Sequence, residues 1–271
     1  MRRLMFLLFL IIGSNLLDAQ DLTILHLNDT HSHIEPERHG AKVGLGGVFE
    51  QAAYIDSVRC ADGKENVLLL HAGDFSQGSS YFKQLKGDVE VAVINAMKFD
   101  AVCIGNHEFD NGTDELARRL KNINVPVVCA NYDFTRTALG NYIRPYVIVE
   151  KAGRKIGIIG LLTDISTLVE TDIAAKIKYL PPAQIAEKYA SRLKSEGCDL
   201  VICLTHLGFD DVECSDKDVA AHTRSVDIIV GGHTHTELED YVAVPNLDGK
   251  DVVIVQNGKW GIDFGHLSVK F

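Results

Sequence analysis

Short runs of Val, Ile and Leu recur along this chain and are separated by polar or amphipathic stretches. Runs of this length and composition predict β-strands. The predicted strands are residues 22–27, 67–71, 101–104, 125–129, 155–161, 200–204, 227–230, 252–255 and 267–271. Strands that alternate with helices along a chain are typical of an α/β fold.

Between several of these runs, apolar residues recur every three or four positions, as they do on one face of a helix. The predicted helices are residues 47–58, 89–97 and 182–196, together with one that begins near Thr113 and runs through Leu116 and Leu120. Residues 134–145 and 207–216 are predicted to be loops. No repeat and no linker rich in Pro, Gly or Ser interrupts the pattern, so residues 20–271 are predicted to form one domain.

The first nineteen residues have the three parts of a secretory signal peptide. Arg2 and Arg3 are followed by an apolar run over residues 4–12, and Leu17-Asp18-Ala19 offers a small-residue cleavage site. A membrane-spanning helix needs about 20 apolar residues, which this run does not reach. The alternative is an N-terminal core helix. The pattern favours a signal peptide over residues 1–19, an exported protein in the periplasm or outside the cell, and no stable membrane anchor.

Composition and charge limit the classes of function. The 271 residues are 46% hydrophobic and 24% charged, as expected of a chain that folds around a core. The formal net charge is −10. An acidic surface repels the phosphate backbone of nucleic acids, so a general nucleic-acid binder is excluded. A small phosphorylated substrate remains compatible with this charge.

The cysteines do not form a metal or disulfide framework. Cys103, Cys129 and Cys203 lie inside apolar runs, where cysteine packs as a small buried hydrophobe. The pairing of the others is left open by the sequence: these are Cys60, Cys198 and Cys214.

Residue types that ligate metals follow five of the predicted strands. They occur in Asn28-Asp29-Thr30-His31, Gly73-Asp74, Asn106-His107-Glu108 with Asp110, Thr205-His206 and His233-Thr234-His235. In an α/β sheet, the loops after the carboxyl ends of the strands gather at one edge, where ligands bind. The sequence therefore predicts that these side chains converge.

The predicted set contains two carboxylates, an amide and four histidines, which is enough for two adjacent metal sites. Oxygen and imidazole ligands without thiolate suit Zn, Mn or Fe(II) better than Cu(I). Asp29 and His31 stand two positions apart, so in extended backbone they point to the same side. Asp74 is the natural bridging ligand, because one carboxylate can hold two cations about 3.5–4 Å apart.

Five sequence blocks, LHLNDTHSH, HAGDFSQG, IGNHEFD, LTHLG and GGHTHT, resemble the calcineurin-like metallophosphoesterases. These motifs are most similar to those of the secreted 5'-nucleotidase branch, which includes cyclic-nucleotide phosphodiesterases and UDP-sugar hydrolases. The resemblance implies a four-layer α-β-β-α sandwich, in which two packed β-sheets are flanked by helices. It covers nearly all of residues 20–271.

The resemblance also implies roles for single residues. It places Asp29, His31, Asp74 and His235 on one divalent metal ion, and Asp74, Asn106, His206 and His233 on a second. His107 resembles the family's catalytic histidine and Asp110 its orienting partner, and Asn106 and His107 would contact the substrate. The implied reaction is the hydrolysis of phosphomonoesters, chiefly nucleotides. The resemblance implies attack by a metal-bound hydroxide, assisted by His107.

Other activities of the superfamily stay open at this stage. They are cleavage of 2',3'-cyclic nucleotides, hydrolysis of UDP-sugars and hydrolysis of sulfur esters. Members of the 5'-nucleotidase branch usually carry a second, C-terminal domain that recognises the base, and no segment of this sequence resembles it. We therefore expect either hydrolysis of small phosphoesters with little base preference, or a catalytic subunit that acts with a separately encoded C-terminal partner.

Several residues outside this set are expected to be structural. His26 and His71 lie within strands and are predicted to be hydrogen-bonded core histidines. His33 is expected beside the metal site or on the surface. The basic residues Lys83, Lys86, Arg118 and Arg119 are predicted to be solvated helix surface.

Overall fold

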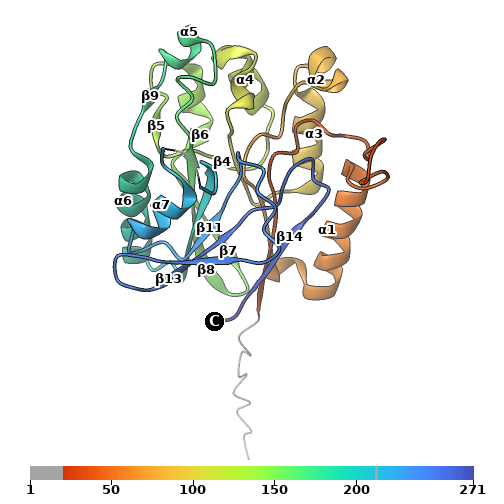
Figure 1. Cartoon of the computed structure of the whole chain (residues 1–271). Coiled ribbons are helices and arrows are strands. Elements are labelled where there is room, and N and C mark those ends of the chain that lie inside the picture. The colour runs from red at the N-terminus through yellow and green to blue at the C-terminus, as the bar shows by residue number, and fades with distance from the viewer. Residues whose placement is uncertain (1–20, 211–212) are drawn as a thin grey trace, which may run out of the picture.

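Two six-stranded β-sheets packed face to face form the centre of the protein in the computed structural model, which describes residues 21–210 and 213–271 (Figure 1). The predicted signal peptide over residues 1–19 lies outside the described residues. Within the described residues, no helix is long and apolar enough to span a membrane.

The first sheet has the strand order β14-β1-β2-β3-β4-β6. Its strands are parallel except β14, which pairs antiparallel with β1. They span β1 Leu22–Leu27, β2 Val67–His71, β3 Ala101–Cys103, β4 Val127–Val128, β6 Ile143–Arg144 and β14 Gly265–Val269.

The second sheet has the order β12-β13-β11-β10-β8-β7, with a parallel centre and an antiparallel strand at each edge. Its strands span β7 Tyr146–Lys151, β8 Arg154–Leu162, β10 Leu200–His206, β11 Ile228–Val230, β12 Val242–Pro245 and β13 Asp251–Val255. A separate two-stranded ribbon pairs β5 (Tyr132–Asp133) with β9 (Lys178–Tyr179).

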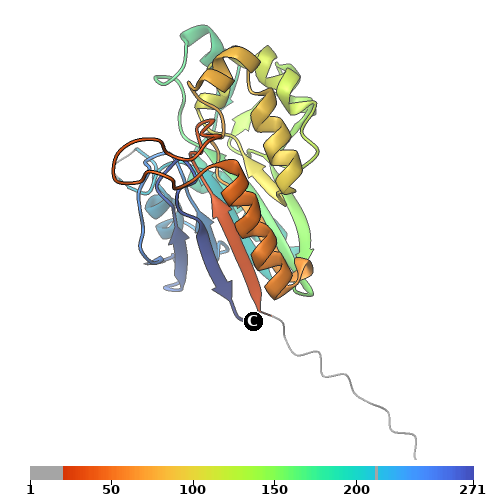
Figure 2. The same ribbon diagram turned by 90° about the vertical axis from the view of Figure 1, so that its right-hand side faces the viewer.

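Helices cover the outer face of each sheet (Figures 1 and 2). The first sheet is covered by α1 (Val48–Asp62) and α3 (Asp88–Met97), with α4 (Gly112–Leu120) beyond them. The second is covered by α6 (Pro182–Ser195) and α7 (Asp216–Ala221). The shorter helices are α2 (Ser80–Leu85), α5 (Thr171–Ala174) and the 3₁₀ turns Lys64–Asn66, His107–Phe109 and Ala138–Asn141. The implied four-layer α-β-β-α sandwich is confirmed.

Alternate side chains of the central strands enter different layers, which explains the unbroken apolar runs in the sequence. In β2, Leu68 and Leu70 pack between the two sheets, whereas Leu69 packs under α1 and α3. In β8, Ile156 and Ile158 face the other sheet, and Ile159 faces α6. A strand that is buried on both faces must be apolar at every position.

The structure corrects several local predictions. Residues 134–145 are not one loop, since they include a 3₁₀ turn and strand β6. Helix α4 begins at Gly112, so Thr113 lies in its first turn and does not cap it. Predicted strand 125–129 shortens to Val127–Val128, consistent with Pro126, which lacks a backbone donor for a strand ladder.

Three of the cysteine predictions are confirmed, because Cys103, Cys129 and Cys203 are buried in apolar surroundings. All six cysteines lie in the described residues and all are unpaired, including the three whose pairing the sequence left open.

The two sheets come into close backbone contact where Gly160 of β8 meets the end of β4 and the residues after it. The Gly160 carbonyl accepts a hydrogen bond from Ala130 N at 2.8 Å. A Cβ atom on Gly160 would lie 2.2 Å from the carbonyl oxygen of Val128. On the other face of the same strand, a Cβ on Gly157 would meet only the side chain of Leu193, at 2.7 Å.

We predict that Gly160→Ala lowers the free energy of unfolding by about 1–3 kcal/mol, because backbone of the opposite sheet must move. Gly157→Ala is the matched control, and it should cost less because the Leu193 side chain can change rotamer. Urea unfolding of both variants measures the difference. Equal losses would contradict the close sheet contact at Gly160.

Candidate active site

The predicted ligands all follow strands that end on the same side of the sandwich (Figures 1 and 2). Three loops of the first sheet carry Asp29, His31, Asp74 and Asn106, after β1, β2 and β3. In the second sheet, His206 is the last residue of β10, and the loop after β11 carries His233 and His235. The site is therefore built by both sheets together, at the carboxyl ends of their parallel strands, where ligands commonly bind in α/β folds.

Asp29 is completely buried, and its two carboxylate oxygens have different surroundings. Oδ2 accepts hydrogen bonds from Asn28 Nδ2 at 2.7 Å and from the backbone N–H of His233 at 3.0 Å. Oδ1 has no hydrogen-bond partner among the described residues and lies 3.4 Å from His235 Nε2 and 3.6 Å from His31 Nε2. One oxygen thus fixes the carboxylate, and the other is free to ligate.

The two carboxylate oxygens of Asp74 also differ: one is held by a hydrogen bond and the other faces histidine nitrogens. Its Oδ1 accepts the backbone N–H of His107 at 2.9 Å. Its Oδ2 lies 3.1 Å from His206 Nε2 and 3.4 Å from His31 Nε2. Because Oδ2 of Asp74 faces ring nitrogens from both sheets, it stands where the sequence predicted a bridging carboxylate.

The ring of His206 is fixed in the orientation that a metal ligand requires. Its Nδ1 donates to the backbone carbonyl of Ala72 at 2.8 Å, so in the neutral ring Nε2 is the nitrogen that carries the lone pair. Histidines that bind metals usually donate their other ring N–H to a carbonyl or carboxylate in this way. Gly73 and Gly232 make room for the ring, because a Cβ on either would come within 2.9 Å of His206 Nδ1.

The site fits divalent cations. Within the described residues, three groups of side chains bring their ligand atoms within 4.8 Å of one another, namely Asp29 with His31 and His235, Asp29 with Asp74 and His206, and His31 with Asp74 and His107. Asp29 Oδ1, Asn106 Oδ1 and His206 Nε2 are buried there without hydrogen-bond partners in the described part of the chain. Buried polar atoms of this kind are normally satisfied, so a bound cation explains all three.

Asn106 and His233 stand outside these three groups but beside them. Asn106 is buried and its side-chain oxygen is unpaired, as noted above. The His233 ring packs edge-on against that of His206, with centroids 5.2 Å apart. His33, in contrast, stacks on Trp260 with centroids 5.2 Å apart and joins none of the groups.

The backbone of the site is held in an unusual conformation. The φ angles of Asp29, His31, Asp74, His233 and His235 are positive, between 48° and 78°. Only a few per cent of non-glycine residues adopt such angles, and each costs on the order of 1–3 kcal/mol. Strain concentrated on five predicted ligands indicates that their side-chain directions are selected for function.

His107 stands at the edge of the cluster and is more exposed than the buried ligands. Its Nδ1 lies 3.2 Å from both carboxylate oxygens of Asp110, as the resemblance implied for an orienting pair. Its Nε2 lies 2.8 Å from Nε2 of Gln77, a contact that the sequence did not suggest. Burial opposes protonation, but the hydrogen bond to Asp110 and the charge of Asp74 raise the pKa of His107 above its usual value.

The charges inside the site attract a cation. Burial opposes ionisation of the two aspartates, yet His206 keeps the pKa of Asp29 below its usual value and that of Asp74 well below it. Burial likewise opposes protonation of His206, but Asp74 and Asp29 raise its pKa to about 10. A positive charge is therefore strongly favoured between these carboxylates, and a divalent cation can take the place of the proton on His206.

Glu108 is a functional residue that the sequence reasoning missed. Its buried carboxylate accepts the backbone N–H groups of Gly105, Asp74 and Ser76 at 2.6, 2.9 and 3.0 Å, and the Ser76 hydroxyl at 2.9 Å. These donors belong to the loops after β2 and β3, so one side chain ties together the loops that carry Asp74 and Asn106. Burial and the charge of Asp74 raise the pKa of Glu108 to about 7.

Arg119 corrects a prediction, because it is completely buried and not solvated helix surface. From α4 it donates to Ser76 Oγ at 2.8 Å and to the carbonyl oxygen of Glu108. Its neighbour Arg118 does lie at the surface, where it pairs with Asp88 and Glu115. Arg119 thus joins helix α4 to the same two ligand-bearing loops.

We predict that Glu108→Gln lowers the free energy of unfolding by about 1–3 kcal/mol, because the new NH₂ group faces backbone donors and leaves them unpaired. Glu115→Gln is the control, since it breaks only an exposed ion pair and should change stability by less than about 0.5 kcal/mol. Chemical denaturation compares the two. Equal stability of both variants would show that Glu108 does not hold the two loops together.

Comparison with known proteins agrees with this geometry. The family described as calcineurin-like phosphoesterase matches residues 22–237. Snake venom 5'-nucleotidase from Naja atra is 35% identical over 273 residues, covering 93% of this chain and 50% of the relative. NAD 5'-nucleotidase from Haemophilus influenzae is 31% identical, covering 93% and 45%. The chain spans about half the length of these curated relatives.

The crystal structure of a 5'-nucleotidase precursor from Thermus thermophilus superimposes with a TM-score of 0.83 at 35% identity, covering 93% of this chain and 51% of that one. Both the sequence match and the shared fold span the strands and loops that carry the candidate ligands. On this evidence, the chain belongs to the calcineurin-like phosphoesterases, a family of phosphoric ester hydrolases.

Proposed function

We propose that this chain hydrolyses phosphate esters of nucleotides with the help of two divalent cations. The observation that carries the proposal is the pair of buried aspartates, each of which holds one oxygen by hydrogen bonds and turns the other toward histidine Nε2 atoms. The substrate class rests on the relatives, which are named as 5'-nucleotidases and as an NAD 5'-nucleotidase.

Asp29, His31, Asp74 and His235 would hold the first cation, and Asp74, Asn106, His206 and His233 the second. The short distances from Asp29 to His31 and His235 support the first set. The contact between Asp74 and His206 and the unpaired oxygen of Asn106 support the second. Zn, Mn and Fe(II) all suit this mixture of oxygen and imidazole ligands. Such cations supply Lewis-acid chemistry, because they neutralise phosphoryl oxygens and acidify water.

His107 would act on the ester from the edge of the cluster. Its ring is oriented by Asp110, whose hydrogen bond raises the pKa of His107 against the opposing effect of burial. In its protonated form the ring would donate a hydrogen bond to a phosphoryl oxygen or a proton to the departing alcohol. Asp110 would keep the ring turned toward the substrate. The side chain of Asn106, beside His107 in the chain, would contact the phosphate as well as a cation.

We also propose that the protein is exported. The basic start, the apolar run over residues 4–12 and the small-residue cleavage site support a signal peptide over residues 1–19. An exported nucleotidase would meet nucleotides outside the cytoplasm.

Removal of metal should abolish hydrolysis and lower thermal stability, because the clustered carboxylates would lose their counter-charge. Chelator-treated protein is expected to lose AMP hydrolysis by more than about 100-fold, and added Mn²⁺ or Zn²⁺ is expected to restore it. Turnover on AMP, on a 2',3'-cyclic nucleotide and on a UDP-sugar defines the substrate class. Full activity after complete metal removal would disprove the proposed mechanism.

His107→Ala should lower kcat by about 10²–10⁴-fold, because the acid that assists the leaving group is lost. Its metal content should stay at the wild-type level, since His107 is not proposed as a ligand. His39→Ala, at an exposed position in the loop after β1, is the control and should keep wild-type turnover. A His107→Ala protein that loses its metals would make His107 a ligand, as its proximity to His31 and Asp74 also permits.

A further inference from the structure

The loop after β11 carries a ligand for each of the two proposed cation sites. His235 is proposed for the first cation and His233 for the second, and only Thr234 separates them in the chain. Both histidines have left-handed backbone, with φ angles of 53° and 78°. Such conformations persist only where neighbouring contacts hold them. The two ligands therefore depend on whatever fixes this loop.

The side chain of Gln256 makes the contacts that fix it. Gln256 directly follows β13 and is completely buried. Its Nε2 donates to the backbone carbonyl of Gly232 at 2.7 Å. Its Oε1 accepts the backbone N–H of Thr236 at 2.5 Å and the hydroxyl of Thr234 at 3.2 Å. One amide thus holds the loop immediately before, between and immediately after the two histidines.

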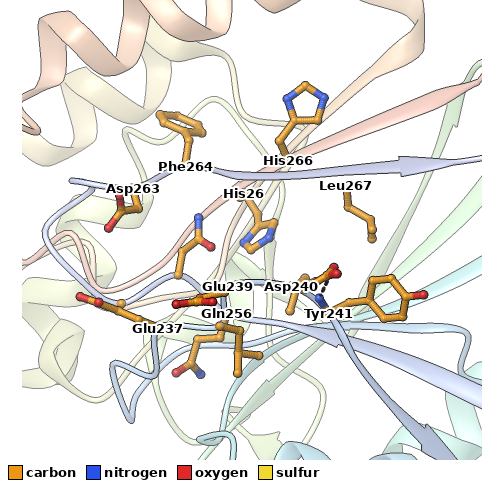
Figure 3. A pocket seen from close by; sticks show the side chains of 15 residues that line it. His26, Glu237, Glu239, Asp240, Tyr241, Gln256, Asp263, Phe264, His266 and Leu267 are labelled. Atoms are coloured by element: carbon orange, nitrogen blue, oxygen red, sulfur yellow. Dashed lines mark hydrogen bonds between the residues drawn. The ribbon is translucent and has the colours of Figure 1, made fainter.

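These contacts require an amide at this position. A carbonyl oxygen can only accept and a backbone N–H can only donate, so the partners determine which way the amide faces. A hydrocarbon side chain makes neither contact. The side chain of Gln256 points away from His26 and from the cavity beside it, toward the interior of the protein (Figure 3). Its polar atoms are therefore committed to the loop.

The backbone that follows Gln256 reaches the ligand-bearing loop of the other sheet. The backbone N–H of Asn257 donates to Asn28 Oδ1 at 3.0 Å. Asn28 Nδ2 donates to the carbonyl of Gly258 at 2.7 Å and to Asp29 Oδ2 at 2.7 Å. This short segment after β13 therefore contacts loops from both sheets, each of which carries proposed ligands.

From these contacts we propose that Gln256 is a positioning residue for both cation sites. Its amide holds the loop after β11 in the conformation from which His233 and His235 would ligate. The inference rests on the proposed binding of two cations. Replacing a residue that orients metal ligands typically weakens metal binding by about 10–100-fold. Because one side chain serves both histidines, its loss should weaken both sites together.

The variant Gln256→Met tests the proposal, since it keeps the length of the side chain and adds no charge. The chelator-treated full chain is titrated with Mn²⁺, and binding is followed by calorimetry and by the electron paramagnetic resonance signal of free Mn²⁺. We expect the wild-type chain to bind two Mn²⁺ ions and the variant to bind both about 10–100-fold more weakly. This readout needs no substrate and no turnover.

Asn246→Leu is the matched control. Asn246 is also a buried amide, and its Nδ2 donates to the carbonyl of Arg224 at 3.2 Å. Its Oδ1 accepts the backbone N–H groups of Asp248 and Lys250 at 2.9 and 3.0 Å. It lies in the turn between β12 and β13, at the end of β13 away from Gln256. The control loses the same kinds of hydrogen bonds and should keep wild-type affinity for Mn²⁺.

Thermal unfolding of the metal-free proteins completes the comparison. Both variants are expected to unfold at a lower temperature than the wild-type chain, because each leaves buried backbone groups unpaired. Only Gln256→Met should also lose affinity for Mn²⁺. If this variant fails to fold, Gln256→Asn decides the question. It keeps an amide but is one methylene too short to reach all its partners, and it should weaken both sites about tenfold.

The proposal is overturned if the folded Gln256 variant binds two Mn²⁺ ions with wild-type affinity, if only one of the two sites is weakened, or if Asn246→Leu weakens binding equally. A wild-type chain that binds no Mn²⁺ would overturn the proposed function together with this inference. The wild-type titration alone distinguishes that case.

Discussion

Two neighbouring carboxylates, those of Asp29 and Asp74, are buried at the junction of the two sheets, and their charge must be balanced inside the protein. A buried ion without compensation is too costly to persist, so partners are required. Backbone and amide donors satisfy one oxygen of each, and histidines face the other. Their ion-pair contacts, within the part of the chain that the structure describes, are all with histidines and never with Lys or Arg. Imidazole is neutral when it ligates a metal, so in the proposed metal-bound form a cation would balance the two charges.

The structure around these carboxylates stabilises the strained backbone that positions them. Left-handed backbone at Asp29, Asp74 and three histidines points several side chains inward from short loops. Such conformations persist only where the surroundings over-determine them. Strands buried on both faces supply a rigid base, and Glu108 with Arg119 ties the loops after β2 and β3 to helix α4. The packed core and these ties therefore stabilise the strained loops at the edge of the sheets.

Much of this arrangement was predictable from the sequence, and the exceptions have physical causes. The central strands were predicted because burial on both faces makes every position apolar. The candidate ligands were predicted to converge because they lie at the ends of those strands, and several of them do lie close together, while their role as ligands stays a prediction. The edge strands β7 and β6 escaped detection, since β7 is only half-buried and β6 has two residues. Arg119 escaped because nothing local distinguishes it from the exposed Arg118, and only the tertiary contact with Ser76 and Glu108 pairs its charge. His26 was placed correctly in the core, but its Nδ1 atom has no hydrogen-bond partner among the described residues, which the sequence could not show.

The side chains of the candidate site differ in their exposure to solvent. The side chains of Asp29, His206 and Asp74 are at most 3% exposed, whereas those of His107 and His235 are 29% and 33% exposed. The side of His107 and His235 is therefore open to an approaching substrate. An anionic phosphate arriving there meets an acidic protein, with a net charge of −10, and no Lys or Arg pairs with the buried aspartates. In the proposed mechanism the attraction would come from the cations and from His107, so that affinity for phosphate and the ability to cleave it would depend on the same few groups.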